Sequence, residues 1–122
     1  KSGRLLDRDH LLASLLEREN LHSTALPNGI AICHPRRPLP SAISDYVIAV
    51  LRTLSPLSFG AENGEKTQLF FLLCAPDDRT HLHGLARLAR VLDSDTIKIL
   101  KSREVYHPDQ LLEVISAREL SL

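Results

Sequence analysis

An unbroken apolar run at residues 69–75 (LFFLLCA) is the feature that most limits what this chain can fold into. A strand with one face in water alternates apolar and polar residues, whereas a strand covered on both faces is apolar throughout. Two shorter runs, 30–33 (IAIC) and 46–51 (YVIAVL), have the same character. The sequence therefore predicts a small sheet with helices packed on both of its faces.

Four other segments carry apolar residues three or four positions apart, the period of a helix that buries one face. The positions expected to face the core are Leu11, Leu12, Leu15 and Leu16; Leu82, Leu85, Leu88, Ala89 and Leu92; Ile97 and Leu100; and Leu111, Leu112 and Ile115. Asp7 and Asp78 are the expected N-caps of the first two helices. The third helix is expected to start at Ser94 or Asp95, and Pro108 suits the first turn of the fourth.

The order of these elements, one helix, three strands and three helices, predicts an α/β layered domain. Segments rich in Pro, Gly, Asn and Ser separate the elements and are expected to be irregular: 21–29, 35–41 and 53–66. At 122 residues the chain is long enough for one domain with a buried core.

Charge and hydropathy exclude two classes of partner. Lys and Arg together number 15 and so do Asp and Glu, so the chain lacks the basic surplus of a protein that binds nucleic acid directly. No apolar run approaches the roughly 20 residues that a membrane-spanning helix needs, and no signal peptide opens the chain. We therefore expect no nucleic-acid binding and no membrane insertion.

The cysteines and the missing methionine bear on location and completeness. Cys33 and Cys74 form no CxxC or disulfide pattern, and each ends an apolar run, which is typical of small buried side chains in a reducing, cytoplasmic compartment. The chain contains no methionine and opens on Lys1. We expect it to be a piece of a longer protein.

Three residues could build a site together. His34 stands where the strand at 30–33 meets a proline-rich segment, and ligands of open α/β sheets bind beyond the carboxyl ends of strands. His81 lies in the first turn of the helix after the third strand, near N–H groups and a dipole that attract anions. Arg18 closes the first helix. If they converge, these groups could hold a phosphoryl group.

Each of these residues also has a structural interpretation. A histidine at a strand end is more often a hydrogen-bonded part of the framework, and His81 could only polarise a helix start. Arg18 would ordinarily be solvated, and so would Arg36 and Arg37 in their turn. His83 is two residues from His81, so the two side chains point apart on a helix.

Two other chemistries lack their signatures. Zinc ligands usually occur as CxxC, HxxxH or HExxH pairs, none of which is present, so no metal or other cofactor is expected. A serine nucleophile of the α/β-hydrolase kind would need a GxSxG elbow, which is also absent.

Two separated stretches resemble one known family. The stretch 15–34 (LLERENLHSTALPNGIAICH) has an RE pair at a helix end, a small polar loop with ST, and an NGIAI run before His34. The stretch 59–94 ends in THLHGLARLARVLDS, which opens a helix. Both resemble the enzyme IIA domains of the bacterial phosphotransferase system (PTS), fructose/mannitol and nitrogen-regulatory type. The resemblance covers about 7–118.

The resemblance implies a three-layer α/β/α sandwich with a small mixed sheet and a role as a phosphotransferase component. It implies that His34 is the phosphorylated residue and that Arg18 and His81 are its active-site companions. The implied donor is the phosphocarrier protein HPr or its nitrogen-branch counterpart. The implied acceptor is a sugar-specific enzyme IIB, unless the phosphoryl group is kept as a regulatory mark.

The chain departs from the family pattern in two respects. The family sequence IPHG is here ICHP, with Cys33 for the proline and Pro35 for the glycine. Pro35 has no N–H and biases His34 towards extended geometry. The family also begins with a further strand and helix, which this chain is expected to lack. The resulting open sheet edge predicts self-association, and so a homo-oligomer.

Three interpretations remain open at this level. The chain could be a working phosphotransferase domain. It could be a non-catalytic regulatory module, fused to or controlling a transcription factor, because some relatives are joined to a helix-turn-helix segment. It could also be a structural domain without surviving activity.

Overall fold

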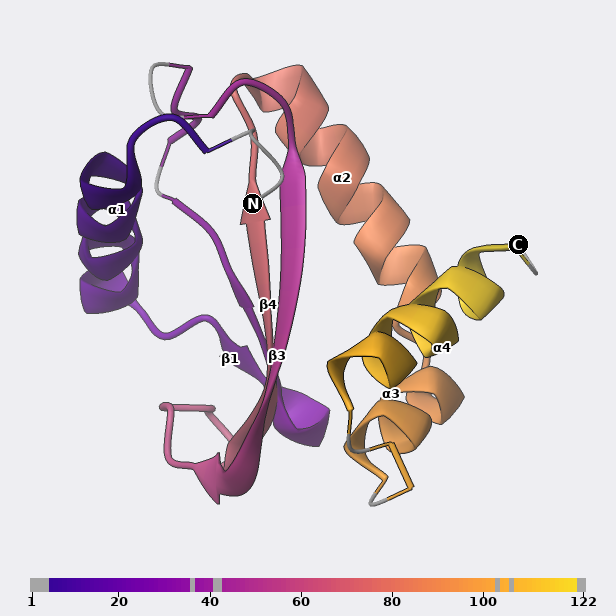
Figure 1. Cartoon of the computed structure of the whole chain (residues 1–122). Helices are drawn as coiled ribbons and strands as arrows, with labels where there is room; N and C mark the ends of the chain where they lie inside the picture. The colour runs from indigo at the N-terminus through magenta and orange to yellow at the C-terminus, as the bar shows by residue number, and fades with distance from the viewer. Residues whose placement is uncertain (1–4, 36, 41–42, 103, 106, 121–122) are drawn as a thin grey trace.

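The computed structural model describes residues 5–35, 37–40, 43–102, 104–105 and 107–120 (Figure 1). In chain order the elements are α1 (Arg8–Leu21), β1 (Ala25–Leu26), a 3-10 turn η1 (Pro27–Gly29), β2 (Ile30–Cys33), β3 (Val47–Leu57), β4 (Thr67–Cys74), α2 (Asp78–Val91), α3 (Ser94–Lys101) and α4 (Pro108–Leu120).

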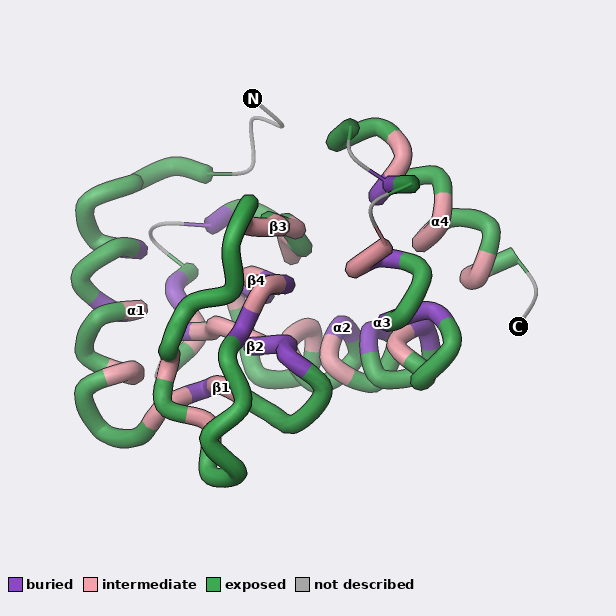
Figure 2. Tube along the Cα trace, turned by 90° about the horizontal axis from the view of Figure 1, so that it is seen from below, coloured by how far each residue is buried: buried purple, intermediate pink, exposed green. Residues whose placement is uncertain are grey.

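The strands form one four-stranded mixed sheet in the order β1-β2-β4-β3. β2 and β4 run parallel, whereas β1 pairs antiparallel with β2 and β3 pairs antiparallel with β4. α1 lies on one face of the sheet, and α2, α3 and α4 lie on the other, as the two views show (Figures 1 and 2). The expected three-layer α/β/α sandwich with a small mixed sheet is confirmed.

β4 packs on both helical layers, as its apolar run predicts. Leu69 and Phe71 point to the side of α2, α3 and α4, where Leu88, Ile97, Leu100 and Leu111 surround them. The alternate positions, Leu72 and Cys74, contact Leu11 of α1 together with Leu39 and Ile43. Two hydrophobic clusters, one on each face, therefore hold the sheet between its helices.

The expected helix starts at Ser94 and Pro108 are confirmed, but one cap and several core positions are wrong. Asp7 caps α1 as expected, whereas Asp77 rather than Asp78 caps α2 and Asp93 caps α3. The apolar residues expected to be buried but found exposed are Leu12, Leu16, Leu82, Ala89 and Leu112. Each helix lies against the sheet or its neighbours along a narrow stripe. An adjacent leucine on the helix is turned about 100° away from that stripe.

β3 is longer than expected. The run at 46–51 predicts a strand that ends there, but pairing with β4 continues to Leu57, with a register shift between Arg52 and Leu57. Pro56 lies within that irregular part, at a sheet edge, where its missing N–H is tolerated. The segment 53–66 is therefore strand up to Leu57 and loop beyond it.

The segment at 21–29 was expected to be a loop, but it contains the short strand β1. Ala25 and Leu26 pair with Ala31 and Ile30 of β2, because the turn at Asn28 and Gly29 folds the chain back. Asn28 and Gly29 both have positive φ, of 71° and 75°. The irregular conformation expected at 35–41 is confirmed for residues 35 and 37–40, and Ser41 lies outside the described residues.

Candidate functional site

β2 delivers His34 to the edge of the sheet where the parallel pair β2 and β4 ends. Cys33, the last residue of β2, is in register with Leu72 of β4. The Nδ1 atom of His34 lies 3.0 Å from the backbone oxygen of Ile32. A carbonyl oxygen can only accept, so Nδ1 carries the proton in this contact. The lone pair of Nε2 is therefore available, and the side chain is half-buried rather than enclosed.

α2 brings His81 to the same edge. The ring centroids of His81 and His34 are 5.7 Å apart, and the rings are tilted by 45°. Burial, and then the proximity of His34, hold the pKa of His81 below its ordinary value, while the Asp78 carboxylate acts in the opposite direction. His81 is consequently neutral over a wider range of pH than a free histidine.

A small cavity of about 150 Å³ lies at this histidine pair. Its lining residues are His34, Pro35, Arg37, Pro38, Ala75, Asp78 and His81. The charged residues in this lining are one arginine and one aspartate, and they accompany two histidines. We call it the histidine cavity.

A larger cavity of about 540 Å³ lies on the Arg18 side of His34. Arg18, Ser23, Thr24 and Ile32 are among its lining residues. The guanidinium of Arg18 donates from Nη1 to the backbone oxygen of His22 at 2.6 Å, which fixes it at the end of α1. We call this the arginine cavity.

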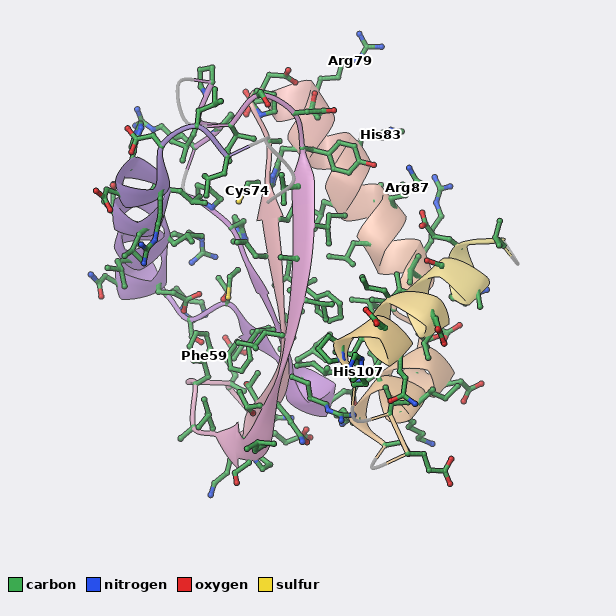
Figure 3. All side chains as sticks on the ribbon, in the orientation of Figure 1. Phe59, Cys74, Arg79, His83, Arg87 and His107 are labelled. Carbon is green, nitrogen blue, oxygen red and sulfur yellow. The ribbon has the colours of Figure 1, made fainter. Side chains whose placement is uncertain are left out.

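The segment after α1 is braced from two sides. The Glu19 carboxylate accepts hydrogen bonds from the backbone N–H and the hydroxyl of Thr24. The hydroxyl of Ser23 donates to the backbone oxygen of Phe59, whose ring packs edge-to-face on Phe70 at 4.9 Å between centroids. Figure 3 labels Phe59 in this region. The loop after β3 therefore closes against the arginine cavity.

The structure brings the three expected site residues together only pairwise. His34 lines both cavities, Arg18 lines only the arginine cavity, and His81 lines only the histidine cavity. His34 thus lies between a guanidinium and a second imidazole. His83 is exposed and points away from the sheet, as expected (Figure 3).

Two residues of the site were missed from the sequence. Asp78 was expected to cap a helix, and Arg37 was expected to be a solvated turn residue. Arg37 is exposed as expected, but it lines the histidine cavity together with Asp78. The spacing of Asp78 and His81 could have indicated the first, because residues three apart on a helix are neighbours. Arg36 lies outside the described residues.

The two cysteines are unpaired thiols. Burial raises the pKa of Cys74 to about 11, and burial also raises the pKa of Cys33, which the Thr24 hydroxyl contacts at 3.6 Å. Cys33 beside His34 therefore stays protonated near neutral pH and does not compete with the imidazole as a nucleophile.

Neither a metal site nor a membrane-spanning helix is found among the described residues. No group of three or more His, Cys, Asp or Glu side chains within them is placed to hold a metal ion. No helix in the same part of the chain combines the length and the apolar character that crossing a membrane requires.

Comparison with known proteins shows which family the chain belongs to. Residues 1–118 match the family model described as phosphoenolpyruvate-dependent sugar phosphotransferase system, EIIA 2. The chain is 38% identical over 91 residues to a nitrogen regulatory protein of Bradyrhizobium diazoefficiens, covering 72% of this chain and 58% of that protein. It is 27% identical over 121 residues to the fructose-specific EIIABC component of Bacillus subtilis, covering 98% of this chain and 18% of that protein.

A solved complex of enzyme IIA-mannitol with phosphorylated enzyme IIB-mannitol from Escherichia coli has the same fold. Its TM-score is 0.72 at 20% identity, and the match covers 94% of this chain and 77% of that one. The chain spans 18% of the length of the EIIABC component and 58% of the length of the nitrogen regulatory protein. The match to the family model extends over almost all of the chain, so this protein belongs to the EIIA type-2 family of the sugar phosphotransferase system.

Proposed function

We propose that this domain carries a phosphoryl group on Nε2 of His34. The observation that supports this most strongly is the contact between His34 Nδ1 and the backbone oxygen of Ile32. It holds the ring in the tautomer whose Nε2 lone pair is free, at a strand end that opens on two cavities.

The proposed step is an in-line phosphoryl transfer between two histidines. The Nε2 lone pair of His34 forms a bond to phosphorus while the N–P bond of a donor phosphohistidine breaks, and the donor ring keeps that electron pair. Nδ1 of His34 keeps its proton against Ile32. Catalysis of such a step is mostly positioning and charge stabilisation, which Arg18 on one side and His81 on the other would supply.

The proposed donor is HPr or its nitrogen-branch counterpart, and the proposed acceptor is an enzyme IIB or a regulatory target protein. One relative is named as a component of a fructose-specific PTS system and another as a nitrogen regulatory protein, so the proposal includes both kinds of acceptor. The solved IIA-mannitol complex with phosphorylated IIB supports a IIB partner. Control of a transcription factor gains no support from these relatives and is not part of the proposal.

A cytoplasmic location belongs to the same proposal. Its support is the pair of unpaired thiols at Cys33 and Cys74, which suits a reducing compartment.

The test is phosphorylation from phosphoenolpyruvate through enzyme I and the carrier. The expected result is acid-labile phosphate on the native chain and on His83→Gln, and none on His34→Gln. His83 is the matched control, because it lies two residues from His81 but is exposed and faces away. Label that persists in His34→Gln, or that depends on His83, would contradict the proposal.

A further inference from the structure

The charged residues that line the histidine cavity indicate a role for Asp78. Asp78 is the first residue of α2 and His81 is the fourth, so their side chains lie over adjacent turns of the same helix face. Both line the histidine cavity with His34 and Arg37. Asp78 is free for this role because Asp77, not Asp78, accepts the capping hydrogen bond from Thr80 N at 2.7 Å.

The groups that face His81 can be named from each side. The end of β2 and the segment after it contribute His34 and Arg37, and α2 contributes Asp78. Arg37 and Asp78 line the cavity although both are exposed. Arg79 and His83 of α2 are also exposed, but they do not line the cavity, and Figure 3 shows both pointing away from the sheet. In the unphosphorylated site the Asp78 carboxylate favours a proton on His81, but burial and the proximity of His34 outweigh it and hold the pKa of His81 low.

A phosphoryl group on His34 changes that balance. It brings about two negative charges on its oxygens into the region between the two cavities. A nearby anion favours the charged form of a histidine. The ring centroids of His34 and His81 are only 5.7 Å apart, so the imidazole of His81 is close enough to gain a proton in response.

We propose that Asp78 is a positioning residue of the phosphoryl site. It favours the protonated form of His81 while His34 carries the phosphoryl group, so that the domain takes up a proton from solvent together with the phosphoryl group. This inference rests on the proposed function of His34. The N–P bonds exchange as described above, and the added proton resides on His81, which then donates a hydrogen bond to a phosphoryl oxygen.

The proposal predicts how the degree of phosphorylation changes with pH. In the unphosphorylated chain burial and His34 hold the pKa of His81 low, so above that pKa the ring is neutral. The phosphoryl group raises this pKa. Between the two values phosphorylation takes up a proton, so the equilibrium degree of phosphorylation falls as pH rises through that window. Below and above this window His81 has the same charge in the phosphorylated and the unphosphorylated chain. There the degree of phosphorylation no longer depends on pH through His81.

The experiment follows the His81 ring by NMR in histidine-labelled protein, with its signal assigned by His81→Gln. The titration is measured for the native chain, Asp78→Asn, Asp78→Glu and Asp95→Asn, before and after phosphorylation by enzyme I and the carrier. Asp95 is the matched control, since it is an exposed aspartate in the first turn of α3, away from the site.

We expect Asp78→Asn to lower the midpoint of the His81 titration by about half to one pH unit, as one charge near the surface does. Asp78→Glu should restore most of the loss, and Asp95→Asn should change nothing. Phosphorylation of the native chain should raise the midpoint by more than about one pH unit.

The contradicting outcomes are distinguishable. If Asp78→Asn titrates like Asp95→Asn, the role of Asp78 is overturned. If His34 is phosphorylated but the titration of His81 does not move, the coupling to a proton is overturned and the proposed function stands. If His34 is never phosphorylated, the proposed function is overturned and the coupling falls with it.

Discussion

The rings of His34 and His81 lie 5.7 Å apart although 46 residues of chain separate them, one at the end of β2 and the other near the start of α2. The parallel pairing of β2 and β4 produces this proximity, because the carboxyl ends of parallel strands meet at one edge of the sheet. Burial, and then this proximity of His34, lower the pKa of His81.

The first prediction concerns this coupling. His34→Gln removes a group that can carry positive charge beside His81, so the pKa of His81 should rise. It should stay below the ordinary value, because burial is the larger cause of its depression. An NMR titration of His81 in the native chain and the variant measures this. A pKa that falls, or does not change, would show that the two rings do not interact.

The same depressed pKa predicts how stability depends on pH. A histidine whose pKa is lower in the folded chain binds fewer protons there than in the unfolded chain. The free energy of unfolding should therefore fall as pH drops from the ordinary histidine value through the lowered pKa of His81. Urea unfolding should show a weaker decline in His81→Gln over that window. An identical decline in both proteins would exclude His81 as the source.

Arg18 should matter for transfer more than for folding. Its guanidinium lines the arginine cavity beside His34, so Arg18→Ala should slow phosphoryl uptake by at least about tenfold, as loss of a charge-stabilising donor does. The unfolding free energy should change by less than about 1 kcal/mol. Arg8→Ala, an exposed residue at the other end of α1, serves as control. Equal rates for the two variants would remove Arg18 from the site.

Pro35 should be a handicap. It is buried against the histidine cavity and offers no N–H to a phosphoryl oxygen on the neighbouring His34. Pro35→Gly should raise the rate of uptake several-fold. A hydrogen bond to a charged group contributes about 1.5–3 kcal/mol, and glycine supplies the N–H that could form one without fixing its direction. Stopped-flow or quenched-flow phosphorylation measures the rate. No change would mean that the phosphoryl group does not use that amide.

The edge of β3 should mediate self-association. Leu51 and Leu54 are 60% and 103% exposed on this edge strand. Unpaired apolar strand edges pair readily with other chains. Sedimentation velocity should show a concentration-dependent dimer that Leu54→Lys abolishes. Leu120→Lys, at the end of α4 where the leucine is 90% exposed, should leave the dimer intact. A native chain that stays monomeric at all concentrations would show the prediction wrong.

The apolar runs predicted the sheet and its burial, because a strand covered on both faces needs apolar side chains at successive positions. The helix positions were harder. Leu82 fits the apolar period of α2 but is 63% exposed. The helix approaches the sheet closely at Gly84, beside Leu73, so the buried face of α2 is centred on Gly84 and Leu82 lies outside it. β1 has only two residues, too few for any periodicity to show.

The site was only partly predictable for a similar reason. His34 and His81 could be named from their motifs, because local sequence places each beside the end of a strand. The charges of Arg37 and Asp78 in the histidine cavity could not, since they depend on how the segment after β2 folds across the start of α2. Spacing along the chain does not determine such a contact.

The proposed role of His34 is tested most directly by identifying which nitrogen carries phosphorus after phosphorylation by the carrier. Two-dimensional proton–nitrogen NMR of the 15N-histidine-labelled chain distinguishes the two ring nitrogens of His34. The expected result is phosphorus on Nε2 of His34, with the Nδ1 proton still present and hydrogen-bonded to the Ile32 oxygen. Phosphorus on Nδ1 of His34, or on either nitrogen of His81, would contradict it.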